Sequence, residues 1–271
     1  IITAILLYNV SALSRDAKIY TKIYDDRLEH CQGNPLNKSH TYITFYYEDA
    51  VESFQDSNGN LIVKLKDNYR TEAYLENEKE KGTQLFYKTD HHWTTESAFN
   101  SYCVVADALG FTPKSKDFFS IETVADDFNG TLYSKTLNEK IDPDSIEFYR
   151  SSTDFTLTVK DETYSSLYFK DWLKEKDKYS FFLNGNHGVC RIENKSANGK
   201  LLVIKDSYAN CILPFLAEHY AEITVVDPRY CSHSQIKDIC VEDFDAVITL
   251  FNVSGFSQEQ NFSLIEFMGG K

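Results

Sequence analysis

Three short apolar runs in the last third of the chain constrain its fold more than any other feature of the sequence. They occupy residues 201–204, 223–226 and 246–251, and each is short and apolar enough to be a β-strand buried on both faces. Between them, the segment 208–220 carries apolar residues at helical spacing, with a kink or an early break expected at Pro214, and the segment 234–240 predicts a short helix. Strands that alternate with helices in this order form right-handed βαβ units, so the sequence predicts a parallel sheet in an α/β fold.

Two segments nearer the N-terminus add to this prediction. Residues 1–8 predict a further buried strand. A helix is expected to begin after Thr94 or Thr95, whose hydroxyl groups can cap it, and to end at Gly110. Its apolar face consists of Ala98, Tyr102, Val105 and Leu109.

The middle of the chain has a different pattern. Residues 145–149 and 155–159 alternate apolar with polar side chains, as half-exposed antiparallel strands do. We therefore expect one α/β domain over residues 1–271, with a β-rich insertion at residues 111–200.

The composition argues against several classes of function. The 271 residues carry 28 Lys and Arg against 41 Asp and Glu, a net charge of −13, and 42% of them are apolar. Such a chain can bury a core, but its acidity disfavours nucleic acid or an anionic membrane surface as a partner. No apolar stretch approaches the roughly 20 residues that span a bilayer. The six cysteines form no C-x-x-C pair, so we expect buried thiols rather than a metal site or a disulfide framework.

Polar residues at the ends of the predicted elements are the candidates for chemistry. The run 89–93 precedes the capped helix, Ser207 follows a buried strand, and Asn252 follows the last strand. Ligands of open parallel sheets bind beyond the carboxyl ends of the strands, where Ser207 and Asn252 are expected. Backbone N–H groups at a helix N-terminus favour an oxyanion beside Ser207. A plain N-cap role for that serine is the alternative.

Asp90 and His92 can supply the other half of a catalytic triad. A serine nucleophile needs a base, and an imidazole needs a carboxylate to orient it. Two alternatives stay open at this point. A metal site would use Asp90, His91 and His92, although three consecutive residues chelate poorly, and a surface histidine pair in a turn would have no catalytic role. We expect that this site binds no metal ion.

Four further residues have two interpretations each. Asn252 either donates its side-chain amide to an oxyanion or caps the turn after its strand. Arg229 either holds an anionic group in the same cleft or forms a structural ion pair. Asn186 and His187 lie in a tight loop that either borders the site or is a simple turn.

Two separate blocks of the sequence resemble one known family. Residues 87–94 (YKTDHHWT) resemble the signature of the bacterial DHHW family, and residues 202–210 (LVIKDSYAN) with 225–230 (VVDPRY) resemble its second block. This family is similar to the SGNH/GDSL hydrolase-like domains of the alginate O-acetyltransferases. The resemblance implies a three-layer, SGNH-hydrolase-like parallel sheet. It also implies a circular permutation, because the acid and base precede the serine here, whereas the serine comes first in ordinary SGNH hydrolases.

The same resemblance assigns roles to the candidate residues. Ser207 would be the nucleophile, His92 the base and Asp90 the acid that orients the base. Asn252 and the backbone N–H of Ser207 would form the oxyanion hole. The further candidates for substrate contacts are Arg229, Asn186, His187, Tyr208 and Trp93. The chain differs from ordinary GDSL enzymes in its D-x-H spacing, where they have D-x-x-H, and in Lys205, where they have glycine.

The function implied by the resemblance is serine-dependent acyl-ester chemistry on a carbohydrate, without a cofactor. We expect O-acetyl transfer to a cell-surface or exported polysaccharide through an acetyl-serine, with a membrane-bound O-acyltransferase as a partner. The alternatives are an acetylesterase acting on an acetylated sugar and a non-catalytic polysaccharide-binding surface protein. An extracytoplasmic location is expected, with an N-terminal anchor or signal ahead of Ile1 that this sequence lacks.

Overall fold

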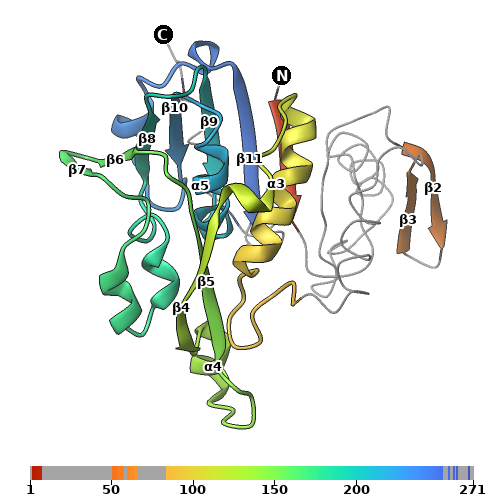
Figure 1. Cartoon of the computed structure of the whole chain (residues 1–271). Coiled ribbons are helices and arrows are strands. Elements are labelled where there is room, and N and C mark those ends of the chain that lie inside the picture. Colours follow the sequence, from red (N-terminus) through yellow and green to blue (C-terminus); the bar gives the residue numbers. More distant parts are fainter. Residues whose placement is uncertain are drawn as a thin grey trace.

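The computed structural model describes residues 2–7, 51–57, 60–65 and 84–252, together with Phe256, Glu259, Asn261 and Met268 (Figure 1). Cys31 lies outside these residues. The other five cysteines are free, and two of them, Cys190 and Cys211, are buried.

A seven-stranded mixed sheet in the order β1-β11-β9-β10-β8-β6-β7 forms the centre of the protein. Its strands are β1 (Ile2–Leu7), β6 (Phe155–Val159), β7 (Glu162–Tyr164), β8 (Val189–Asn194), β9 (Lys200–Lys205), β10 (Glu222–Val226) and β11 (Ala246–Asn252). The first four strands in the sheet order pair in parallel, which confirms the predicted parallel strands. The remaining strands β8, β6 and β7 each pair antiparallel with their neighbours, so the sheet is mixed rather than parallel throughout. Antiparallel strands tolerate one solvated face, which suits the alternating burial along β8.

The segment 111–200 contributes both to this sheet and to a separate ribbon. β6, β7 and β8 extend the central sheet. Outside it, β4 (Ser120–Phe128) pairs antiparallel with β5 (Asp144–Arg150), and α4 (Thr131–Thr136) lies between them in sequence. The antiparallel strands predicted at 145–149 and 155–159 are thus confirmed. A further two-stranded antiparallel sheet joins β2 (Val51–Ser57) and β3 (Asn60–Leu65).

The parallel strand β9 is buried on both faces. Leu201 and Val203 of β9 belong to one buried cluster, which also contains residues of the helix that follows His92. Leu202 and Ile204 belong to a second cluster, with Ile236. Side chains that alternate along one strand therefore enter different clusters, which explains why the run is apolar throughout.

The long helix α3 (Thr95–Leu109) agrees with the prediction. Thr94 caps it by accepting a hydrogen bond from the backbone N–H of Ser97, and Gly110 ends it with a φ of 76° in the left-handed region. The remaining helices are short: η2 (Lys116–Phe118), η3 (Lys170–Lys174), η4 (Lys178–Phe181), η5 (Ser207–Cys211), α5 (Leu213–Leu216), α6 (His233–Ile236) and η6 (Val241–Asp243). Within the described residues, none of the helices is long and apolar enough to cross a membrane.

The helical segment predicted at 208–220 is broken, as expected from Pro214, and its last helix ends at Leu216 rather than Tyr220. The structure has η5 and then α5, with Pro214 near the N-terminus of α5. Proline has no backbone N–H to donate, so it is tolerated at the start of a helix and not within it. The helix predicted at 234–240 is also shorter than expected, because α6 ends at Ile236.

Candidate active site

Ser207 lies where β9 turns into η5, beyond the carboxyl end of a central parallel strand. The preceding residue, Asp206, caps η5 by accepting a hydrogen bond from the backbone N–H of Tyr208 at 2.9 Å. Its second carboxylate oxygen accepts from the backbone N–H of Asn252 at 2.7 Å, which joins the ends of β9 and β11. The capping role considered for Ser207 therefore belongs to Asp206, and the Ser207 hydroxyl has another partner.

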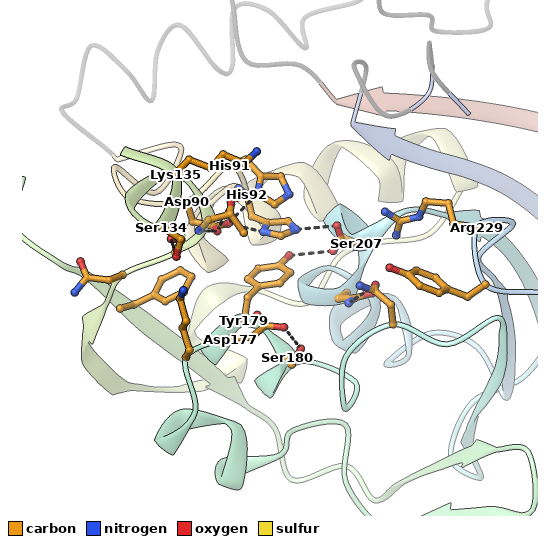
Figure 2. Close-up of a pocket in the computed structure, with 18 residues that line it drawn as sticks. Asp90, His91, His92, Ser134, Lys135, Asp177, Tyr179, Ser180, Ser207 and Arg229 are labelled. Carbon is orange, nitrogen blue, oxygen red and sulfur yellow. Dashed lines mark hydrogen bonds and ion pairs between the residues drawn. The ribbon is translucent and has the colours of Figure 1, made fainter. Parts of the chain in front are cut away.

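That partner is the imidazole of His92. Its Nε2 lies 2.8 Å from the Ser207 Oγ, and its Nδ1 lies 2.5 Å from Oδ1 of Asp90. Figure 2 shows the imidazole between the carboxylate and the hydroxyl. The three groups form one continuous chain of hydrogen bonds. All three side chains are largely buried: Asp90 is 2% exposed, His92 5% and Ser207 9%. The histidine comes from the loop before α3, so segments distant in sequence build this chain together.

The carboxylate of Asp90 is held from the segment between β4 and β5. Its Oδ2 accepts hydrogen bonds from the backbone N–H of Thr131 at 2.7 Å and from the Thr131 hydroxyl at 2.9 Å. Gly130 precedes this threonine, and a Cβ atom there would lie 2.2 Å from the Cβ of Asp90. Only glycine allows the loop to approach the acid so closely.

The ionisation of the pair suits a carboxylate that orients a neutral base. Burial alone would raise the pKa of Asp90, but the nearby His91 and the hydrogen bonds from His92 and Thr131 outweigh it and hold that pKa well below its usual range. Burial lowers the pKa of His92 to about 4, against the opposing effect of Asp90. At neutral pH the imidazole is therefore uncharged and can accept a proton from the Ser207 hydroxyl.

A buried lysine organises the polar groups beside Ser207. The Lys205 ammonium, on a side chain that is 2% exposed, donates to Asp227 Oδ2 at 3.2 Å, Asn210 Oδ1 at 2.9 Å and Asn186 Oδ1 at 3.1 Å. Asp227 also accepts two hydrogen bonds from the Arg229 guanidinium, at 2.9 and 2.7 Å. Arg229 thus forms the ion pair considered as one of its two roles.

A cavity of about 550 Å³ opens over the hydrogen-bonded chain. Its lining includes five of the candidate residues, namely Asp90, His92, Ser207, Arg229 and Asn186. It also carries the side chains of Lys135, Lys176 and Asp177. Figure 2 shows Arg229 on one side of Ser207 and Lys135 on the other, beyond Asp90.

Four candidate residues are not among those that line the cavity. Trp93 is 2% exposed, and its Nε1 donates to the Tyr208 carbonyl at 2.9 Å. The Tyr208 hydroxyl in turn donates to the carbonyl of His91. His187 directs Nε2 to the Leu183 carbonyl at 2.9 Å. These three side chains support the loops around the site, and Asn252 contributes the backbone hydrogen bond to Asp206 described above.

The group Asp90, His91 and His92 could hold a metal ion by proximity, since its ligand atoms lie within 4.8 Å of one another. Both ring nitrogens of His92 are engaged, one with Asp90 and one with Ser207. A metal ion on this group would have to displace one of those hydrogen bonds. The geometry therefore favours a proton relay over a metal centre.

Sequence reasoning missed Gly130, Thr131 and Tyr179. The first two position Asp90, and the ring of Tyr179 stacks on that of His92 at a centroid distance of 3.7 Å. All three lie in the segment predicted as an insertion. No motif there marks them, because their importance depends on contacts with residues far away in sequence.

Solved structures that are similar to the chain include the following three proteins. A DHHW family protein from Eubacterium siraeum is 26% identical, with a TM-score of 0.59 over 73% of this chain and 68% of that one. PatB1 from Bacillus cereus, solved with a sulfonyl adduct, is 18% identical, with a TM-score of 0.54 over 72% and 69% of the respective chains. The O-acetyltransferase domain of AlgJ from Pseudomonas putida is 15% identical, with a TM-score of only 0.38 over 70% and 60%.

Sequence comparison identifies the family. No curated protein matches the sequence. The family described as DHHW protein matches residues 52–226, which is more than half of the chain. This match includes Asp90, His92 and Ser207, and it agrees with the resemblance of the two sequence blocks. The chain therefore belongs to the DHHW family.

Proposed function

We propose that the protein carries out serine-dependent acyl-ester chemistry on a carbohydrate, with transfer of an acetyl group to a polysaccharide as its reaction. The observation that carries the proposal is the continuous chain of hydrogen bonds from Asp90 through His92 to Ser207. A carboxylate, an uncharged imidazole and a hydroxyl in this order are the parts of a nucleophilic triad. The resemblance of the sequence to SGNH-like O-acetyltransferase domains supports the carbohydrate acceptor.

The reaction has two halves. In the first, His92 Nε2 takes the proton of the Ser207 hydroxyl while Oγ attacks the carbonyl carbon of an acetyl ester. The bond from that carbon to the leaving oxygen then breaks, and His92 returns the proton to the departing alcohol, leaving an acetyl-serine. In the second half, a sugar hydroxyl gives its proton to His92 and attacks the acetyl carbon, and Ser207 regains a proton as it leaves.

Charge on the tetrahedral intermediate requires hydrogen-bond donors near Ser207. We propose its own backbone N–H as one donor and the Asn252 amide as the second. The Asp206 carboxylate accepts from the backbone N–H of Asn252 and so holds the end of β11 next to the start of η5. This contact supports a location for Asn252 close to the reacting ester.

We also propose a more detailed fold for the protein, and a location and a partner for its reaction. The order of acid, base and serine along the chain supports a circular permutation of the SGNH fold, with the sheet in a three-layer arrangement. A polysaccharide outside the cytoplasm is the proposed acceptor, and a membrane-bound O-acyltransferase is the proposed partner that delivers the acetyl group.

The first test is the Ser207→Ala variant, assayed on p-nitrophenyl acetate. We expect the rate above background to fall by at least about a thousandfold, because the nucleophile is lost. The exposed Ser196 provides a matched control, and Ser196→Ala should keep the wild-type rate. Treatment of the wild type with a sulfonyl fluoride should add one sulfonyl group to Ser207, detected by mass spectrometry of the peptide. Background hydrolysis by the wild type, without modification of Ser207, would support the non-catalytic binding protein.

A second measurement separates transfer from hydrolysis. With an oligosaccharide acceptor present, a transferase should release acetylated sugar at the expense of free acetate. Release of acetate alone, across neutral and charged acceptors, would support the acetylesterase.

A further inference from the structure

Tyr179 contacts two members of the proposed triad at once. Its ring is stacked on the His92 imidazole, with 3.7 Å between centroids and 8° between the ring planes. Its hydroxyl donates to the backbone carbonyl of Ser207 at 3.2 Å and lies 3.2 Å from the Cys211 sulfur. Figure 2 shows the tyrosine ring below His92, with its hydroxyl toward Ser207. Within the part of the chain that the structure describes, no other side chain both stacks on His92 and hydrogen-bonds to Ser207.

The tyrosine itself is firmly anchored. It is 4% exposed, in the short helix η4, where the neighbouring Phe181 and Phe182 are both fully buried. Its backbone carbonyl accepts from the N–H of Phe182, and the Phe181 carbonyl accepts from the N–H of Phe169 at 2.8 Å. Burial raises the pKa of Tyr179 well above 10, so its hydroxyl stays a neutral donor at physiological pH. Tyr179 is therefore a rigid surface against which another ring can rest.

His92 needs such a surface when its hydrogen bond to Ser207 is lost. Once Ser207 is acylated, its Oγ carries no proton, and only Asp90 would still hold the imidazole through Nδ1. A single hydrogen bond leaves the ring free to tilt out of plane. Contact between parallel ring faces resists that tilt and does not depend on the state of Ser207. The same contact excludes water from one face of the imidazole.

We propose that Tyr179 is a positioning residue of the active site, whose ring holds the His92 imidazole in line with Ser207 and keeps it dry throughout the reaction. This inference rests on the proposed function in so far as Ser207 reacts. The burial that lowers the pKa of His92 to about 4 is consistent with it, since the stacked ring covers part of that imidazole.

Two variants separate the ring from the hydroxyl. Tyr179→Phe keeps the stacked ring and loses the hydrogen bond to the Ser207 carbonyl, so kcat should stay within about threefold of the wild type, since one neutral hydrogen bond contributes little. Tyr179→Leu removes the stack, and kcat should fall by at least about tenfold while KM stays within about twofold. Phe181→Leu is the matched control, because Phe181 is also buried in η4 and its ring packs against Phe148 and Tyr168. Phe181→Leu should lower the melting temperature and leave kcat unchanged.

A substrate-free measurement distinguishes this inference from the proposed function. The pKa of His92, followed by NMR of its ring protons, should rise toward the ordinary value near 6.5 in Tyr179→Leu and stay low in Tyr179→Phe. If this pattern appears in a protein that lacks Ser207-dependent turnover, the positioning role stands and the proposed function fails. Turnover with unchanged kcat and unchanged His92 pKa in Tyr179→Leu would overturn the positioning role. So would a Phe variant as impaired as the Leu variant, or a Phe181→Leu variant with the same kinetic defect.

Discussion

The carboxylate of Asp90 depends on several neighbours for its position in the candidate site. Its Oδ1 accepts from the backbone N–H and the Nδ1 of His92, at 2.9 and 2.5 Å, and its Oδ2 accepts twice from Thr131. These four hydrogen bonds use both oxygens and keep the group ionised although it is buried. Gly130 leaves the space in which they form. The acid of the DHHW motif is therefore completed by a loop outside the motif.

Removing one of these hydrogen bonds should weaken the base without unfolding the protein. Thr131→Val deletes the hydroxyl bond to Asp90 and keeps the backbone N–H bond. A hydrogen bond to a charged group contributes about 1.5–3 kcal/mol, so we expect kcat to fall about tenfold or more in the acetyl ester assay. Thr136→Val is the matched control, because the Thr136 hydroxyl on the same helix α4 bonds only the Leu132 carbonyl. Equal rates for both variants would contradict the role of Thr131.

At the scale of elements, α3 determines where His92 lies. The helix begins three residues after the histidine, with Thr94 as its cap. The Thr94 hydroxyl also donates to the Gln84 carbonyl at 2.9 Å, and the backbone of Tyr87 donates to the His92 carbonyl at 3.1 Å. The 84–94 loop is thus closed on itself against the start of a buried helix. This closure explains why a short polar run can present an imidazole at a defined position.

The cap should therefore contribute measurable stability. Thr94→Ala removes the acceptor for the Ser97 backbone N–H and should lower the free energy of unfolding by about 1 kcal/mol. Thr94→Ser retains the hydroxyl and should recover most of that loss. Urea unfolding of the three proteins measures the difference in the free energy of unfolding from the midpoint and slope of each transition. An Ala variant as stable as the wild type would mean that the helix start does not depend on this cap.

At the scale of the whole molecule, burial of histidines couples folding to pH. Burial lowers the pKa of both His92 and His219 to about 4, whereas an unfolded chain has histidines near 6.5. Between these values the unfolded state binds more protons than the folded state. The stability contributed by the neutral histidines is therefore complete above about pH 6.5 and is lost as the pH falls toward 4.

Urea unfolding at about pH 7.5, 5.5 and 4.5 tests this coupling. The wild type should become steadily less stable below about pH 6.5. His219 lies away from the cavity, where its Nε2 bonds the Tyr102 hydroxyl at 2.7 Å. His219→Gln removes one of the histidines whose pKa burial lowers, so its stability should decline less steeply with acid. Identical slopes for the two proteins would show that His219 does not titrate in this window.

Much of the sheet could be predicted, and less of the site. The strands β9, β10 and β11 were found because residues buried on both faces leave a continuous apolar run, which is a local property. The antiparallel pairing of β8 with β10 was not found, since strand partners are chosen by packing rather than by local spacing. The pairing of His92 with Ser207 followed from the sequence blocks, whereas their distance of 2.8 Å required the fold.

The sequence by itself determined the buried parallel strands, the capped helix α3 and the polar residues at their ends. Each of these follows from spacing, capping and burial within a short stretch of chain. Only the tertiary structure decided that Thr131 holds Asp90, that Tyr179 supports His92, and that Lys205 gathers Asn186, Asn210 and Asp227. The physical reason is that most of these contacts join residues far apart along the chain. A hydrogen bond or a stacked ring of this kind exists only once the sheet has brought its partners together.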